Sequence, residues 1–155
     1  MKRIYPEQPI VAVGGILFKE EELLLVKRKN EPSKGKWSIP GGVVEIGESL
    51  KDALLREIME ETALEVEIKG LVDIYQNIKK DPQGRIRFHY VIIDYWGIIR
   101  RGKVVPSSDI EDAIFLSFWM VKDFDISQDL KKIIYRAIRC YEMGCRDLFQ
   151  WGHDQ

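Results

Sequence analysis

Three glutamates stand close together in the segment REIMEETA, residues 56–63. Glu57, Glu60 and Glu61 are separated by three and four positions, so on a helix they share a stripe about 100° wide. Like charges at these separations repel by about 0.2–0.5 kcal/mol per pair. Glu60 and Glu61 also fall in the last predicted turn, where the helix dipole favours cations. The spacing therefore indicates a site for an added positive charge.

The ordinary explanation for helical glutamates is a solvated face. Here they instead continue the apolar stripe of Leu50, Ala53 and Leu54. Arg56 relieves part of the repulsion, but one cation does not neutralise three carboxylates. A bound divalent cation such as Mg2+ fits best, because hard cations take oxygen ligands.

A glycine-containing loop, IPGGVVEIGES (39–49), stands directly before these glutamates. It carries Glu48 as a fourth acid, and its backbone carbonyls are oxygen ligands of the kind that hard cations accept. Glycines alone are weak evidence. Placed immediately before a stripe of carboxylates, they strengthen the prediction of a metal site.

The run from Gly42 to Leu64, GVVEIGESLKDALLREIMEETAL, resembles the Nudix box, and we call residues 42–64 the box segment. The preceding WSIPGG is similar to the usual lead-in of the Nudix (MutT-like) hydrolase family. Only Ala63 departs from the pattern, where the family has glycine. The matching positions are Gly42, Glu48, Arg56, Glu57, Ile58, Glu60, Glu61 and Leu64.

The resemblance implies a metal-dependent hydrolase with Mg2+ or Mn2+ as cofactor. Glu57, Glu60 and Glu61 are then expected to bind metal, and the Gly41 carbonyl to complete a metal shell. Glu57 is also a candidate general base. Water must attack a phosphorus surrounded by anionic oxygens, so such a site needs cations and a base.

The resemblance implies supporting roles for three further residues. Arg56 is expected to orient a neighbouring carboxylate, and Glu48, like Gly42, to hold the loop against the helix. Where carboxylates crowd in this way, one of them should have a raised pKa, and the roles of base and ligand can exchange.

The substrate implied is a nucleoside diphosphate linked to another moiety. The stretch DPQGRIRFHYVIIDYW (81–96) is similar to the ADP-ribose pyrophosphatase-like branch, so ADP-ribose or a related nucleotide sugar is the first expectation. One alternative is a pyrophosphohydrolase that cleaves a (d)NTP and releases pyrophosphate. The other is a non-catalytic domain that senses a nucleotide.

Outside the box segment, two residues are candidates for the site. A late loop, SSDIEDAIF (107–115), resembles the region that supplies a further acid in many members, and Glu111 is favoured over Asp109 or Asp112. A polar turn explains this loop nearly as well. Arg28 is expected to bind a phosphate, although a solvated strand end explains it equally well.

Alanine at position 63 has a structural consequence. A glycine just past a helix often takes a left-handed conformation, which costs alanine about 1 kcal/mol. We therefore expect a slightly altered helix end with no ligand lost.

Around these residues, the hydrophobic pattern predicts elements in the order strands, helix, strands, helix. Such an order indicates an α/β protein, and the resemblance implies the Nudix fold, an α/β/α sandwich with a mixed β-sheet between helices. The predicted strands are 9–18 and 23–29, as a hairpin, then 64–75, 85–99 and 111–121; the predicted helices are 49–62 and 127–143.

The composition suits one domain over residues 1–155, because 45% hydrophobic residues in 155 suffice for a single core. A net charge of −1 favours a small-molecule nucleotide substrate over nucleic acid. The apolar runs are too short to span a membrane, and no signal peptide is recognisable, so we expect a cytoplasmic protein. Cys140 and Cys145 are expected to be reduced thiols. A homodimer is possible by analogy with the family.

Overall fold

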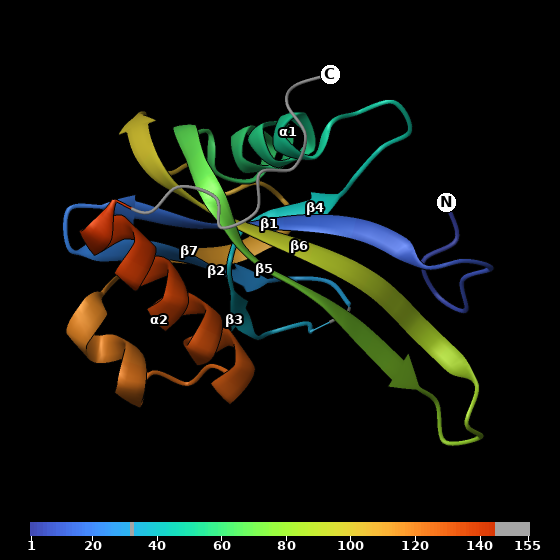
Figure 1. Ribbon diagram of the computed structural model, residues 1–155. Helices are drawn as coiled ribbons and strands as arrows, with labels where there is room; N and C mark the ends of the chain where they lie inside the picture. Colours follow the sequence, from blue (N-terminus) through green and yellow to red (C-terminus); the bar gives the residue numbers. More distant parts are fainter. Residues whose placement is uncertain (32, 145–155) are drawn as a thin grey trace.

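The computed structural model describes residues 1–31 and 33–144. The fold is a mixed β-sheet with α1 (Leu50–Thr62) on one side and α2 (Gln128–Met143) on the other (Figure 1). The predicted α/β/α sandwich is thus confirmed. Cys140 is buried, whereas Cys145 lies outside the described residues. No helix within the described part of the chain is long and apolar enough to cross a membrane.

Among the described residues the sheet has seven strands, and its pair β1 and β6 is parallel. β1 and β6 run in the same direction over nine residue pairs, and the other pairings are antiparallel. The path is β3-β2-β1-β6-β5, with β4 beside β1 and β7 beside β2. The strands are β1 Ile10–Lys19, β2 Glu22–Arg28, β3 Trp37–Ser38, β4 Gly41–Val43, β5 Glu65–Lys80, β6 Ile86–Arg101 and β7 Ile110–Ser117.

The predicted hairpin of β1 and β2 pairs only next to its turn, through Phe18 with Leu23 and Lys19 with Glu22. Farther along, β4 takes the place beside β1, with Gly41 opposite Gly14. Two short strands, β3 and β4, therefore lie between the predicted strand 23–29 and the predicted helix 49–62, where the sequence predicted no strand. This insertion brings the glycine loop to the middle of the sheet.

The first helix forms where the sequence predicts it. Ser49 is the N-cap, and its hydroxyl accepts a hydrogen bond of 3.1 Å from the amide of Asp52. Ala53, Leu54 and Ile58 are fully buried against the sheet. The apolar stripe predicted from the spacing is thus the face that α1 packs on β1 and β5.

The end of α1 differs from the expectation. Ala63 keeps the left-handed backbone (φ 62°, ψ 19°) that a glycine would take, and its amide donates to the Met59 carbonyl. Amides of Val105 and Ser107 bind the Thr62 and Glu61 carbonyls at 2.9 and 3.0 Å. These contacts hold the terminus in place, so the predicted altered helix end is wrong: the backbone of Ala63 is strained instead.

The variant Ala63→Gly should raise the free energy of unfolding by about 1 kcal/mol, because glycine adopts a left-handed backbone without a Cβ penalty. Chemical denaturation measures the change. The matched control is Gly144→Ala at the C-cap of α2, where φ is 68° and an added Cβ would meet no atom of the described residues within 4 Å. This control should lose a similar amount. Equal stability of Ala63→Gly and the wild type would contradict the assignment of strain.

The second helix covers the opposite face of the sheet. Ser127 caps its start with a 3.1 Å hydrogen bond from the Leu130 amide, and Ile133, Ile134 and Ala137 are buried. The preceding strand prediction, 111–121, is wrong at its end. β7 stops at Ser117 and a 3-10 helix, η1 (Phe118–Asp123), follows and buries Val121. The apolar residues that suggested a strand are equally compatible with this 3-10 helix.

Among the aromatic residues of the sheet, Phe88 and Tyr90 are buried against Ile10 and Val43. They are core residues.

Asp94 of β6 is completely buried, and neither of its carboxyl oxygens has a hydrogen-bond partner among the described residues. Burial raises the pKa of Asp94 to about 7, and the negative charge of Asp73 on β5 adds to the rise.

Asp94 should therefore make stability depend on pH. Its pKa in the folded protein, about 7, lies above the ordinary 3.8, so the folded form binds the proton more tightly. This stabilisation is complete below pH 3.8 and is lost as the pH rises through 7. Asp94→Asn lacks the ionisation, so its stability relative to the wild type should increase between pH 4 and 7 and then level off.

Urea unfolding of both proteins across this pH range measures the difference. Arg136 of α2 pairs with Asp73 at 3.4 Å and is retained in both, so its contribution cancels. Parallel pH profiles would show that Asp94 ionises as freely in the folded chain as in the unfolded one.

Candidate active site

Arg56 is the centre of an acidic cluster within the box segment. Its guanidinium donates to Glu48 (2.7 and 2.8 Å), Glu57 (2.9 Å) and Glu60 (3.3 Å) and to the Val43 carbonyl (3.1 Å). Because it contacts three carboxylates at once, Arg56 ties the loop before α1 to the helix. This arrangement brings together the residues that the box pattern predicted.

Glu48 joins the loop to the helix, as expected. One of its oxygens accepts a 2.8 Å hydrogen bond from the Glu45 amide, and both accept from Arg56. The hydrogen bond from Arg56, followed by that from the Glu45 amide, lowers the pKa of Glu48 to about 2. Glu45 itself lies 4.0 Å from Arg56 and was not predicted.

Glu57 lies directly over the glycine loop. Its side chain is 17% exposed, and a Cβ added to Gly42 would overlap its carboxyl group. Glycine at position 42 therefore makes room for this carboxylate. Burial raises the pKa of Glu57, while the hydrogen bond from Arg56 opposes the rise.

Glu61 faces the neighbouring glycine. Its Oε2 accepts a 3.3 Å hydrogen bond from the Gly41 amide. Burial raises the pKa of Glu61 to about 7, the Gly41 amide opposes this, and the charge of Glu57 adds to it. Both carboxyl groups thus have raised pKa values, chiefly because they are buried, and the neighbouring carboxylate adds to the rise in each case.

Glu60 departs from the expected position. Its side chain is 60% exposed, so it lies at the margin of the stripe that holds Glu57 and Glu61. Within residues 1–31 and 33–144, no group of three or more His, Cys, Asp or Glu side chains stands close enough together to hold a metal ion. In this arrangement Glu57 and Glu60 turn toward Arg56.

Two charged residues outside the box segment affect the pKa of Glu61. The positive charge of Arg28 lowers the pKa of Glu61, and the negative charge of Asp109 raises it. Asp109 comes from the loop in which the sequence favoured Glu111, and it accepts a 3.3 Å hydrogen bond from Asn30. The side chain of Glu111 is exposed at the start of β7. Only the fold distinguishes Asp109 from Glu111, because in the sequence both positions suit a further acid of the site equally well.

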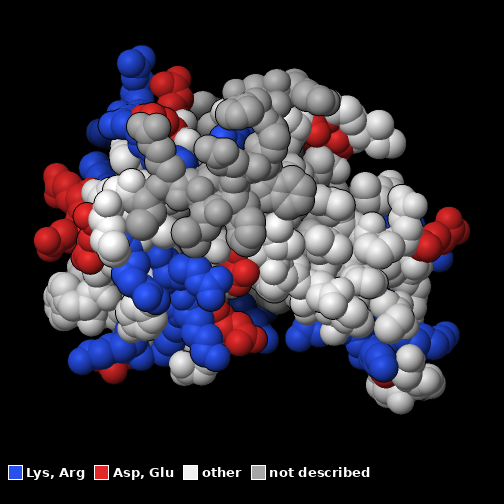
Figure 2. Space-filling model, in the orientation of Figure 1, with Lys and Arg blue, Asp and Glu red and all other residues white. Residues whose placement is uncertain are grey.

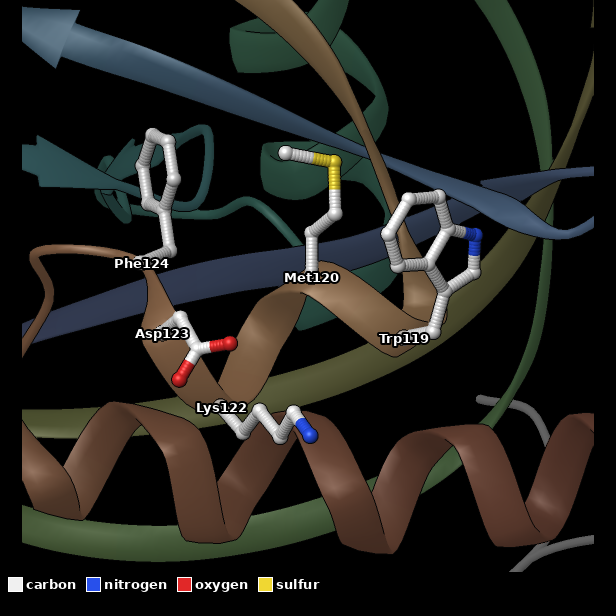
Figure 3. Close-up of a pocket in the computed structure, with 5 residues that line it drawn as sticks. All are labelled: Trp119, Met120, Lys122, Asp123 and Phe124. Carbon is white, nitrogen blue, oxygen red and sulfur yellow. The ribbon is translucent and has the colours of Figure 1, made fainter.

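A hollow of about 380 Å³ lies beside η1, lined by Trp119, Met120, Lys122, Asp123 and Phe124 (Figure 3). Trp119 is 73% exposed, so it does not belong to the core. None of the residues lining this hollow belongs to the box segment. It is therefore a separate feature from the acidic cluster.

Positive charge gathers elsewhere on the surface. Figure 2 shows Lys and Arg side chains over the part of this face where α2 lies. The exposed residues Lys132, Arg136 and Arg139 belong to this helix. Because α1 is on the opposite side of the sheet, these charges do not neutralise the cluster around Arg56.

Comparison with known proteins places these features in context. The family model described as the NUDIX domain matches residues 8–137. An ADP-ribose pyrophosphatase of Methanocaldococcus jannaschii is 41% identical over 143 residues, covering 92% of this chain and 75% of that protein. A putative 8-oxo-dGTP diphosphatase of Bacillus subtilis is 37% identical over 73 residues, about half of each protein.

The solved structures agree with the sequence matches. A MutT NUDIX hydrolase from Burkholderia pseudomallei superimposes with a TM-score of 0.71 at 25% identity. The superposition covers 84% of this chain and 98% of the other.

Proposed function

The chain belongs to the NUDIX family, and from this premise we propose that it hydrolyses the pyrophosphate bond of ADP-ribose or of a related nucleotide sugar. The proposed substrate rests on the 41% identity with an ADP-ribose pyrophosphatase over 92% of the chain. With ADP-ribose, one water is consumed and the products are AMP and ribose 5-phosphate. The reaction needs only residues that can bind phosphate, hold a cation and accept a proton.

The donor set fits a hard divalent cation. Glu57, Glu60 and Glu61 offer only oxygen atoms, and burial disfavours the charged carboxylates of Glu57 and Glu61 until a cation compensates them. We therefore assign these three glutamates, with the Gly41 carbonyl, as ligands of Mg2+ or Mn2+. Glu57 and Glu60 would have to rotate away from Arg56 to bind it. The bound ion would shield the anionic phosphate oxygens and acidify a water molecule.

The chain's own residues supply the remaining chemistry. Glu57 is also the candidate general base, because burial raises the pKa of its carboxyl group and a carboxylate with a raised pKa accepts a proton more readily. Glu48 supports Glu57 indirectly, because it holds Arg56 in place. Gly42 supports it by leaving space for its carboxyl group. Arg28 is the proposed phosphate-binding residue, in keeping with its effect on the pKa of Glu61.

The further acid in the late loop remains a proposal. Glu111 is our first candidate from the sequence, and Asp109 is the alternative supported by its electrostatic effect on Glu61. Comparison of the variants Glu111→Gln and Asp109→Asn distinguishes them, since only the residue that acts in the reaction should lower kcat when replaced.

A second candidate function is a pyrophosphohydrolase that cleaves a (d)NTP and releases pyrophosphate. The partial likeness to the Bacillus subtilis protein favours it. A third, the non-catalytic nucleotide sensor, is disfavoured because every carboxylate of the box segment is present. Single-domain organisation over 1–155, a cytoplasmic location and a homodimer stay predictions.

The test is a hydrolysis screen of nucleotide sugars, dinucleoside polyphosphates and (d)NTPs with Mg2+ or Mn2+, in which the products are separated by chromatography. AMP with ribose 5-phosphate from ADP-ribose supports the first proposal, and pyrophosphate from a (d)NTP supports the second. No product from any substrate with either metal would contradict both.

A further inference from the structure

Asp94 is a buried acid that the proposed reaction does not use. Its side chain has no exposed surface, and both of its carboxyl oxygens lack a hydrogen-bond partner within the part of the chain that the structure describes. A buried polar group without a partner lowers the stability of the folded state. Natural proteins accept such costs mainly at functional sites. The carboxyl group of Asp94 is therefore a candidate for binding a ligand.

A glycine leaves room for this carboxyl group. Gly14 of β1 is the direct neighbour of Asp94 in the sheet, and a Cβ added to Gly14 would overlap Oδ1 of Asp94. The same Cβ would lie 2.9 Å from Cδ1 of Ile39, the flexible end of that side chain. The carboxyl group thus leans over β1 toward the glycine loop. Glycine weakens the interior of a strand, and it often marks a place that a ligand approaches closely.

The carboxyl group lies in the row of the sheet that contains Gly41, one of the proposed metal ligands. Asp94, Gly14 and Gly41 are paired directly on the neighbouring strands β6, β1 and β4. Neighbouring strands are about 4.8 Å apart, so the Cα atoms of Asp94 and Gly41 are about 10 Å apart. The amide of Gly41 in turn donates to Glu61 at 3.3 Å. A nucleoside is long enough to join these two places.

The loop before β4 borders both faces of the sheet. Glu61 approaches Gly41 from α1, whereas Ile39 belongs to the apolar cluster under α2, on the opposite face (Figure 1). Trp96 belongs to the same cluster, and Asp94, two residues before it on β6, shares its face. Among the described strands, β4 pairs only with β1. A ligand lying along this loop can therefore reach the glutamates with one end and Asp94 with the other.

The surroundings of Asp94 suit a flat ring with a polar edge. Asp73, directly opposite on β5, is already paired with Arg136 at 3.4 Å. Tyr75 stands two residues farther along the same strand and is 37% exposed, and Ile39 borders the other side. One acceptor without a partner, among aromatic and apolar side chains, fits a nucleobase. A sugar with several hydroxyl groups would need more polar partners.

We propose that Asp94 determines the base specificity of the enzyme: after the side chain of Ile39 rotates aside, a carboxyl oxygen of Asp94 accepts a hydrogen bond from the C6 amino group of adenine. This inference rests on the proposed function and names the part of the substrate that Asp94 recognises. A carboxyl group keeps an acceptor oxygen whether or not it is protonated. Hypoxanthine carries an oxo group at C6, so it would place a second acceptor against Asp94 and bind less well.

The experiment compares kcat/KM of the full chain for ADP-ribose and for inosine diphosphate ribose, in which hypoxanthine replaces adenine. The wild type should prefer ADP-ribose about tenfold or more, mainly through KM, because one hydrogen bond is lost with the other base. Asp94→Asn presents an acceptor and a donor at the same place, so the preference should fall to about twofold or less. The matched control, Asp73→Asn, changes the acid directly opposite in the sheet and should keep the wild-type preference.

The comparison of the two substrates on the wild type requires no variant to fold, and equal kcat/KM values overturn the role of Asp94. An unchanged preference in Asp94→Asn, or an equal loss of preference in Asp73→Asn, overturns it as well. In each of these cases ADP-ribose is still hydrolysed, and the proposed function stands. If the wild type hydrolyses neither substrate, the proposed function fails and the inference falls with it.

Discussion

Glu57→Gln is expected to lower kcat for ADP-ribose hydrolysis by about 1,000-fold or more, because it removes a negative charge from both the proposed metal site and the general base. The amide keeps the size of the side chain and can still contact Gly42. Steady-state rates at saturating Mg2+ measure the effect. The folded state should persist, since the variant removes a buried charge that costs desolvation.

The control for this variant is Glu65→Gln. Glu65 is an exposed glutamate at the start of β5, 3.6 Å from Arg101, and it belongs to no part of the proposed site. Its replacement should leave kcat unchanged. If Glu57→Gln retained wild-type turnover on every substrate that the protein accepts, the argument from crowded carboxylates would be wrong.

Gly42→Ala is expected to lower kcat/KM by about 100-fold, since a displacement of about 1 Å in a catalytic group can cost this much. The added Cβ would overlap the carboxyl group of Glu57. A flexible carboxylate can move aside, so the protein should fold with Glu57 displaced. The prediction is therefore a loss of activity with little loss of stability, measured by kinetics and urea unfolding on the same preparation.

Two other glycines provide the comparison. At Gly41 an added Cβ would overlap the backbone carbonyl of Val13, which cannot move aside, so Gly41→Ala should lose stability as well as activity. At Gly35 an added Cβ would meet no atom of the described residues within 4 Å, but the backbone is left-handed (φ 76°). Gly35→Ala should therefore lose stability and keep its activity. Full activity of Gly42→Ala would show that Glu57 does not need the space above this glycine.

The helix of the box segment could be predicted almost completely because its determinants are local. Ser49 caps it through a bond to a residue three positions away, and the apolar spacing selects Leu54 and Ile58 for the core. Contacts at i+3 and i+4 depend only on helical geometry. The contact of Arg56 with Glu60 belongs to this local set, with Glu57 as its immediate neighbour.

Predictions that failed concern positions where distant contacts outweigh local preference. The apolar run at 118–121 favours a strand by composition, yet η1 forms there and buries Val121 in the core under α2. Ala63 should avoid a left-handed backbone, yet bonds from Val105 and Ser107 to the preceding carbonyls hold the helix end. In both cases tertiary packing supplies more free energy than the local preference costs.

By itself, the sequence determined which helix presents the clustered glutamates, and it predicts which side chains carry the chemistry, because residue type and helical spacing act over a few positions. Only the tertiary structure decided that Glu57 and Glu61 are buried with raised pKa values while Glu60 is exposed. It also placed Gly42 beneath Glu57. Burial and long-range contacts depend on how the whole chain packs, and no local pattern encodes them.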